Sequence, residues 1–139
     1  MLNKVFKDAD YLSVPVPTGT LAGKPVRIGG LNVITVTDEG SVTTTINLGA
    51  GVQIVQPTGA QTGNKPGWAS ATLKGSAILQ VTGATTFGSP IFIKTSDNSL
   101  TSTAAAGTKH FGYALGVKTA PAGPVHVKVI NGSSVADAA

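Results

Sequence analysis

Glycine or proline interrupts nearly every window of ten residues in this chain. Both residues are poorly tolerated inside helices, so almost no segment keeps the length that a stable helix needs. Between the interruptions stand short runs of Val, Ile, Thr and Leu, bounded by Gly, Pro, Asn or Asp, which is the pattern of strands and turns. The spacing predicts an all-β, single-domain protein of about nine short strands, either a β-barrel or a β-sandwich.

Local patterns support this interpretation. In Val125–Ile130, three valines alternate with His126 and Lys128, as in a strand with one buried face. Gly29-Gly30 joins two runs as one bulged strand or as a tight hairpin, and Ser96–Ser99 reads as a hairpin turn. The runs that we expect as strands are Tyr11–Val16, Pro25–Ile28, Leu31–Thr37, Val42–Leu48, Val52–Gln56, Ala69–Leu73, Ala77–Val81, Pro90–Thr95, Leu100–Thr103, Phe111–Val117 and Val125–Ile130.

The sequence suggests three regions. Residues 1–20 carry much charge and two aromatics but little sheet pattern, so we expect an N-terminal arm that reaches beyond the barrel. Within it, Pro15 and Pro17 mark Tyr11–Val16 as an edge strand or as part of the extended arm. Residues 21–131 form the predicted barrel, in which 57–67 is an exposed loop, and residues 132–139 form a small, polar, flexible tail.

Composition disfavours several classes of protein. Charged residues make up 12% of the chain, and a net charge of +4 is spread along it, with Arg27 as the single arginine. Nucleic-acid binding normally needs clustered Lys and Arg, so we expect none. The chain has no Cys, which excludes disulfides and thiolate chemistry. It also lacks a signal-peptide pattern and an apolar stretch of membrane length, so we expect a soluble protein without membrane contact.

Few residues offer catalytic or metal-binding chemistry. His110 and His126 are the two histidines, and we expect both to be solvated or partly packed side chains. A metal site would need a third ligand, and Asp97 is the one acid in the second half before the tail. Asp38 and Asp97 fall in turns, where carboxylates cap backbone N–H groups. We therefore predict no catalytic, cofactor-binding or metal-binding residue, no cofactor and no small-molecule substrate.

Aromatic side chains indicate contact with other proteins instead. Phe6 and Tyr11 lie in a segment that cannot bury them by itself, so we expect an interface there. Trp68 follows a polar loop and opens a strand. It is either a core anchor at the barrel mouth or an interface anchor.

Three stretches carry a family resemblance. GKPVRIGGLNVI at 23–34 is similar to an opening G-x-x-V-x-x-G-x-L-x-G-V, with Asn32 where Gly is common, and GSVTTTINLGAGV at 40–52 follows. The third combines FGSPIFIK at 87–94, LTSTAAAG at 100–107, HFGYALGV at 110–117 and VHVKV at 125–129, with Pro90, Ile91 and Phe92 in place of x-V-Y-W. These patterns, over roughly residues 20–130, resemble bacteriophage capsid decoration (cement) proteins.

The resemblance implies a compact β-barrel that assembles as a homotrimer on the outer capsid surface of a virion, after synthesis in the host cytoplasm. It implies a non-enzymatic protein that bridges subunits of the major capsid protein and so stabilises the head. The residues that we expect to contact the shell lie in the arm and are Lys4, Val5, Phe6, Lys7, Tyr11 and Leu12.

Two alternatives remain at this point. A head fibre or spike base domain that binds host glycans would place Trp68 and Tyr113 close together on a groove. A small hydrolase would depend on His110 or His126, and the scarcity of acids counts against it.

Overall fold

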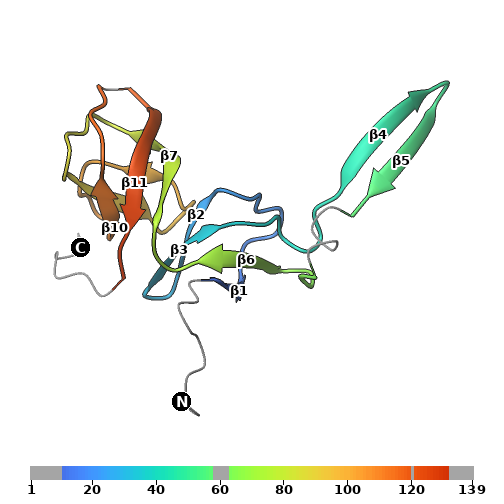
Figure 1. The fold of residues 1–139 in the computed structure, drawn as a ribbon, viewed down its shortest axis with the longest axis horizontal. Coiled ribbons are helices and arrows are strands. Elements are labelled where there is room, and N and C mark those ends of the chain that lie inside the picture. Colours follow the sequence, from blue (N-terminus) through green and yellow to red (C-terminus); the bar gives the residue numbers. More distant parts are fainter. Residues whose placement is uncertain (1–10, 58–62, 120, 132–139) are drawn as a thin grey trace, which may run out of the picture. The chain divides into compact units, whose positions relative to one another are not determined.

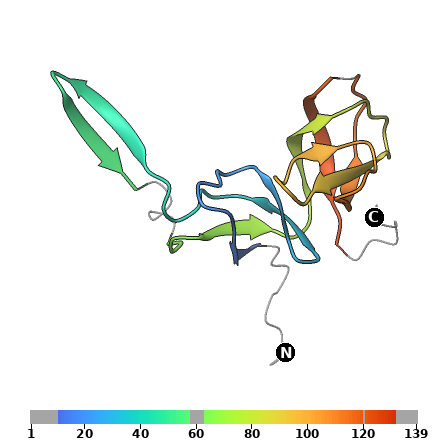
Figure 2. The ribbon, with the colours of Figure 1, turned by 180° about the vertical axis from the view of Figure 1, so that it is seen from behind.

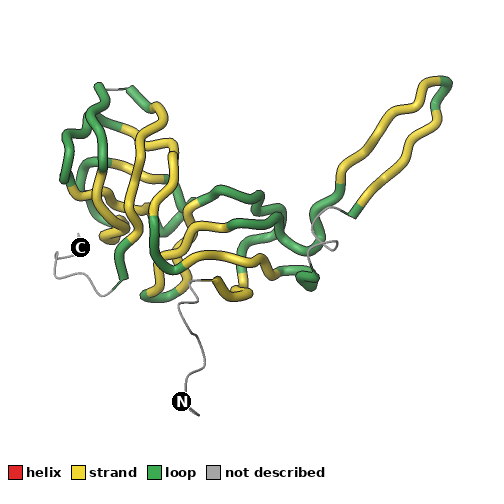
Figure 3. Tube along the Cα trace, in the orientation of Figure 1, coloured by secondary structure: helices red, strands yellow, loops and turns green. Residues whose placement is uncertain are grey.

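The computed structural model describes residues 11–57, 63–119 and 121–131 of the chain. These residues form eleven strands and no helix, which confirms the predicted all-β class (Figures 1 and 3). Each of the eleven predicted runs overlaps one strand, although the overall estimate was about nine. The chain forms two compact units. The first unit takes the described residues within 1–24 and 35–71, and the second takes the described residues within 25–34 and 72–139.

The strands follow the predicted runs closely, and most boundaries differ by one to three residues. Their bounds are β1 (Tyr11–Pro15), β2 (Pro25–Ile28), β3 (Leu31–Thr35), β4 (Thr44–Gly49), β5 (Val52–Gln56), β6 (Trp68–Thr72), β7 (Ser76–Thr82), β8 (Pro90–Lys94), β9 (Leu100–Thr101), β10 (Thr108–Ala114) and β11 (Gly123–Val129).

A closed five-stranded barrel forms the larger part of the second unit. Its strand order is β10-β11-β7-β9-β8, and β8 pairs with β10 to close it. All pairings are antiparallel except the short parallel pair of β7 with β9. Closure leaves none of these five strands at a sheet edge, which removes the unpaired backbone groups that promote aggregation.

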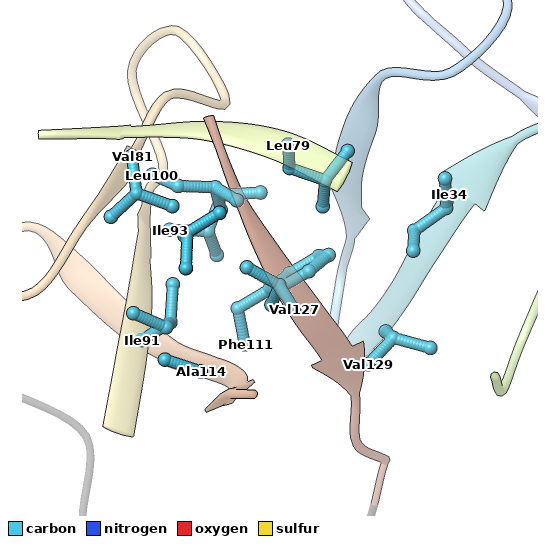
Figure 4. Packing of buried hydrophobic residues seen from close by; sticks show 11 residues of the cluster. Ile34, Leu79, Val81, Ile91, Ile93, Leu100, Phe111, Ala114, Val127 and Val129 are labelled. Carbon is cyan, nitrogen blue, oxygen red and sulfur yellow. The ribbon is translucent and has the colours of Figure 1, made fainter. Parts of the chain in front are cut away.

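Side chains from each barrel strand meet in one apolar core (Figure 4). The period-two pattern predicted for β11 is confirmed, because Val125, Val127 and Val129 are buried while His126 and Lys128 are exposed. The core cluster consists of Ile34, Leu79, Val81, Ile91, Ile93, Leu100, Phe111, Ala114, Val125, Val127 and Val129.

The β2–β3 hairpin is fixed within the second unit by a buried amide. The side-chain nitrogen of Asn32 donates to the carbonyl oxygens of His110 and Ile130, both at 2.9 Å. Its side-chain oxygen accepts from the Arg27 guanidinium at 2.8 Å. Asn32 is 3% exposed, so these hydrogen bonds offset the cost of burying its amide.

In the first unit, β1 is an edge strand beside β6. Of the two alternatives predicted for Tyr11–Val16, the edge strand is therefore observed, with Val14 and Val16 buried and Tyr11 exposed. The chain after β3 joins the same region, because the N–H groups of Val36 and Thr37 both donate to the carbonyl oxygen of Ser70 in β6.

Candidate protein-binding hairpin

Strands β4 and β5 form a two-stranded antiparallel ribbon, which we call the hairpin (Thr44–Gln56). Every residue of both strands is exposed, and no other described strand pairs with them. Figures 1 and 2 show β4 and β5 paired with each other as one long ribbon. A single two-stranded hairpin is at best marginally stable in water, so this element needs cover that the described residues do not supply.

The register divides the hairpin into two unlike faces. Ile46 lies opposite Ile54, and Leu48 and Val52 continue the same face toward the turn. We call these four residues the apolar face. The opposite face carries Thr45, Asn47, Gln53 and Val55. Leu48 is 59% exposed and Val52 is 53% exposed, so the apolar face is open to solvent in a single chain.

The turn suits a long, twisted ribbon. Gly49 pairs with Val52, so Ala50 and Gly51 are the two central residues, and both have positive φ, 50° and 76°. Positive φ at both positions defines the type I′ turn, whose twist matches that of the flanking strands. Gly51 adopts this conformation without strain, whereas Ala50 is strained because of its Cβ.

The hairpin lies in the middle of a stretch without charge. From residue 40 to residue 64 the sequence has no Asp, Glu, Lys, Arg or His, although charged residues occur on both sides at Glu39 and Lys65. An exposed apolar face with no charge on either strand lacks the features that normally keep strand edges from associating. This charge-free run is the sequence signal that indicates the site, and strand periodicity alone does not reveal it.

A buried carboxylate holds the root of the hairpin. Glu39 is fully buried, and its carboxylate accepts hydrogen bonds from the backbone N–H of Gly19 (3.3 Å), from both the N–H (3.1 Å) and the hydroxyl of Ser41, and from the N–H of Gly67. Ser41 precedes β4 and Gly67 follows β5. The Glu39 side chain therefore connects the two ends of the segment that contains the hairpin. Hydrogen bonds from the Ser41 hydroxyl and from Gly67 lower the pKa of Glu39 to about 2.

Close backbone contact fixes the same root. The N–H of Gly40 donates to the carbonyl oxygen of Trp68 at 2.9 Å, and a Cβ at Gly40 would lie 2.2 Å from the Lys65 carbonyl oxygen. Position 40 therefore requires Gly. The Lys65 ammonium lies 4.5 Å from the centroid of the Trp68 ring, a cation–π contact. Trp68 opens β6 as predicted and is half-buried beside this root.

The predicted arm residues are only partly described. Lys4, Val5, Phe6 and Lys7 lie outside the described residues, so their contact with a partner stays a prediction. Tyr11, in β1, is 63% exposed and Leu12 is half-buried, which leaves the Tyr11 ring available to a partner.

The histidines differ from each other. His110 is buried rather than solvated, because its ring packs edge-on against Phe92 (5.8 Å between centroids) and Tyr113 (5.0 Å) in the second unit. His126 is exposed as predicted and lies 2.7 Å from the Ser76 hydroxyl. Across residues 11–57, 63–119 and 121–131, no three His, Cys, Asp or Glu side chains gather as a metal site would require. The same residues contain no helix long and apolar enough to cross a membrane.

Positive charge is concentrated in the second unit. Its described residues include one acid, Asp97, whose predicted role in a turn is confirmed by hydrogen bonds from the N–H (3.0 Å) and hydroxyl (2.7 Å) of Ser99. The described first unit balances Lys24 and Lys65 against Asp38 and Glu39. The cations of the described second unit are Arg27, Lys74, Lys94, Lys109, Lys118 and Lys128.

Two of these cations line an open groove of about 440 Å³ in the second unit. Lys74 and Lys128 lie beside apolar groups, and both side chains are exposed. The remaining lining residues are Leu31, Leu73, Val129, Ile130 and Asn131. A groove with cations beside apolar groups suits an acidic protein surface better than a basic one.

Comparisons with known proteins give no relative from which to transfer a function. No protein-family model matches the chain, and neither a curated protein nor a solved structure does. The resemblance to capsid decoration proteins therefore rests on the motifs quoted above, and the function has to be argued from the hairpin, the charge distribution and those motifs.

Proposed function

We propose that the chain is a non-enzymatic structural protein of a bacteriophage head. It binds the outer surface of the capsid as a homotrimer, bridges subunits of the major capsid protein and stabilises the head lattice. The observation that carries this proposal is the hairpin, whose apolar face is exposed although the chain has a barrel core of its own.

The energetics favour a partner for this face. Burial of apolar surface contributes roughly 25 cal/mol per Å². A protein that only needed to fold would place Ile46, Leu48, Val52 and Ile54 against its own core. Their exposure on a ribbon that is marginal by itself supports a role in which other protein subunits cover them.

Capsid binding suits the charges of the second unit. An excess of Lys and Arg steers a protein toward acidic surfaces, and the groove lined by Lys74 and Lys128 offers a contact of that kind. Because the protein would bind the assembled shell and not free subunits, it would stabilise the shell by mass action. Several contacts in each of many copies would strengthen this effect through multivalency.

Co-sedimentation with expanded, undecorated heads of the encoding phage tests the proposal. We expect the full chain to sediment with heads at a fixed number of copies per head, and heads that carry it to survive heating better than bare heads. A chain that stays in the supernatant at saturating concentration refutes capsid binding. Binding to a glycan array in place of heads would favour the spike alternative.

A second arm of the same assay tests the N-terminal residues. Deletion of residues 1–12 removes Lys4, Phe6 and Tyr11, and we expect weaker head occupancy because Phe6 and Tyr11 would bury apolar area at the shell. Unchanged occupancy would show that residues 1–12 do not anchor the protein.

A further inference from the structure

We infer that the apolar face of the hairpin packs against the same face of other copies of this chain, so that the hairpin is the element that joins the oligomer. This inference rests on the proposed function, in which the chain works by binding protein subunits. It goes further by assigning self-association to four residues, Ile46, Leu48, Val52 and Ile54.

The geometry of the apolar face suits contact with an identical face. Ile46 and Ile54 lie opposite each other across the two strands, and Leu48 and Val52 extend the same face to the turn. Residues of the opposite face are mostly polar, so the ribbon has one side to cover and one side to leave in water. Ribbons of this kind become stable when their apolar sides meet around a shared core.

The charge distribution favours a copy of the same chain as the partner of this face. Identical copies carry identical charges, so contacts through the second unit would bring like charges together, because its described residues hold six cations and one acid. Like charges placed in contact cost free energy. The run from residue 40 to residue 64 has no charge, so copies can approach each other through it without repulsion.

The base of the hairpin is held rigidly, which lowers the cost of binding. The Glu39 carboxylate and the close approach of Gly40 to Lys65 fix the base of the hairpin within the first unit. A ribbon held firmly at its base loses less conformational freedom when it binds than a free loop would. In an oligomer with closed symmetry, each copy presents the same face to the others, so the apolar face of every hairpin is buried.

Two lysine substitutions, one on each face of the hairpin, test whether the apolar face mediates self-association. Light scattering after size exclusion should show the unaltered chain as an oligomer, with a trimer expected from the proposed function. Ile46→Lys should weaken self-association by on the order of 100-fold, because the ammonium would be buried beside its own copies. Asn47→Lys, one residue away on the polar face, should assemble like the unaltered chain.

Either of two results would overturn the inference. One is an unaltered chain that stays monomeric up to the highest soluble concentration. The other is an Ile46→Lys variant that assembles as well as the Asn47→Lys control. Fluorescence of Trp68, the single tryptophan, reports whether the first unit of each variant is folded.

Cysteine variants keep the test decisive if a lysine unfolds the hairpin. The chain has no Cys, so any disulfide must come from the residue introduced. Oxidation should join copies of an Ile46→Cys, Leu48→Cys, Val52→Cys or Ile54→Cys variant, at the positions where symmetry brings Cα atoms within about 7 Å. Asn47→Cys and Gln53→Cys should stay unlinked. Equal linkage on the two faces would contradict the proposed packing.

These measurements use the protein without heads, so the two proposals can fail separately. An assembled oligomer that does not bind heads leaves the hairpin contact intact and refutes the capsid role. Head binding by a chain that stays monomeric off the head and forms no face-specific disulfide refutes the hairpin contact and leaves the capsid role standing.

Discussion

At the scale of single residues, the carboxylate of Glu39 joins segments that lie far apart in the sequence. Its hydrogen-bond donors belong to Gly19, Ser41 and Gly67. The Glu39 side chain thus connects the loop before β2 with the residues that precede and follow the hairpin. Charge is essential to this arrangement, since a protonated carboxyl would accept these bonds less strongly and would have to place an O–H among donors.

The lowered pKa of Glu39 predicts a specific response to acid. Because its folded pKa is about 2 and its ordinary pKa is 4.5, the stability that it contributes is fully present above about pH 4.5 and is lost as the pH falls toward 2. Urea unfolding followed by Trp68 fluorescence at pH 7 and pH 3 should show this loss in the first unit. Glu39→Gln should be less stable at pH 7 and should lose much of the pH dependence. An identical pH response in both proteins would contradict the assignment.

The strained turn residue Ala50 predicts a stabilising substitution. An alanine at φ 50° is less favourable than an asparagine, whose side chain bonds locally to the backbone in this conformation. Ala50→Asn should stabilise the hairpin by about 1 kcal/mol, seen as slower amide exchange over β4 and β5. Ala104→Asn, on an exposed loop position without positive φ, is the matched control and should leave that exchange unchanged.

At the scale of elements, the sequence predicts the strands better than it predicts their partners. The alternation in Val125–Val129 indicated which side of β11 is buried. The turn predicted at Ser96–Ser99 connects β8 to its antiparallel neighbour β9. The same alternation in Val42–Leu48 shows that one face needs cover, but period two does not say which chain supplies it. The burial of His110 and Glu39 was also missed, because their neighbours come from distant segments.

Two phenylalanines test the barrel core. Phe111 is fully buried among the core residues of β7, β8 and β11, whereas Phe87 is 73% exposed. Phe111→Ala should cost about 3–5 kcal/mol because it leaves a cavity, and Phe87→Ala should change the free energy of unfolding little. Thermal and urea unfolding of both variants provide the comparison. Similar losses in the free energy of unfolding would contradict the assignment of Phe111 to the core.

At the scale of the whole molecule, charge and apolar surface are kept apart in the sequence. The charge-free residues 40–64 contain the hairpin, and the cations of the described second unit outnumber its single acid. Under the two proposals made above, this division predicts two kinds of contact. Self-association through the hairpin should depend on apolar burial, and attachment to an acidic shell should depend on charge.

Salt should therefore separate the two contacts. The Debye length falls from about 10 Å at 0.1 M to about 3 Å at 1 M salt, which weakens exposed charge pairs and leaves apolar contacts intact. We expect head occupancy in co-sedimentation to fall over this range while the oligomer mass from light scattering stays constant. Lys128→Glu, at the groove, should lower head occupancy at 0.1 M salt and leave the oligomer mass unaltered. Loss of the oligomer at 1 M salt would contradict the prediction that self-association depends on apolar burial and not on charge.

Hydrogen–deuterium exchange over residues 44–56 tests most directly whether other protein subunits cover the hairpin. The exchange is compared between dilute free protein and protein bound to heads. We predict fast exchange in the dilute chain and strong protection in the assembly, centred on β4 and β5. A hairpin that exchanges equally fast in both states would show that its exposed apolar face is not a protein-binding surface.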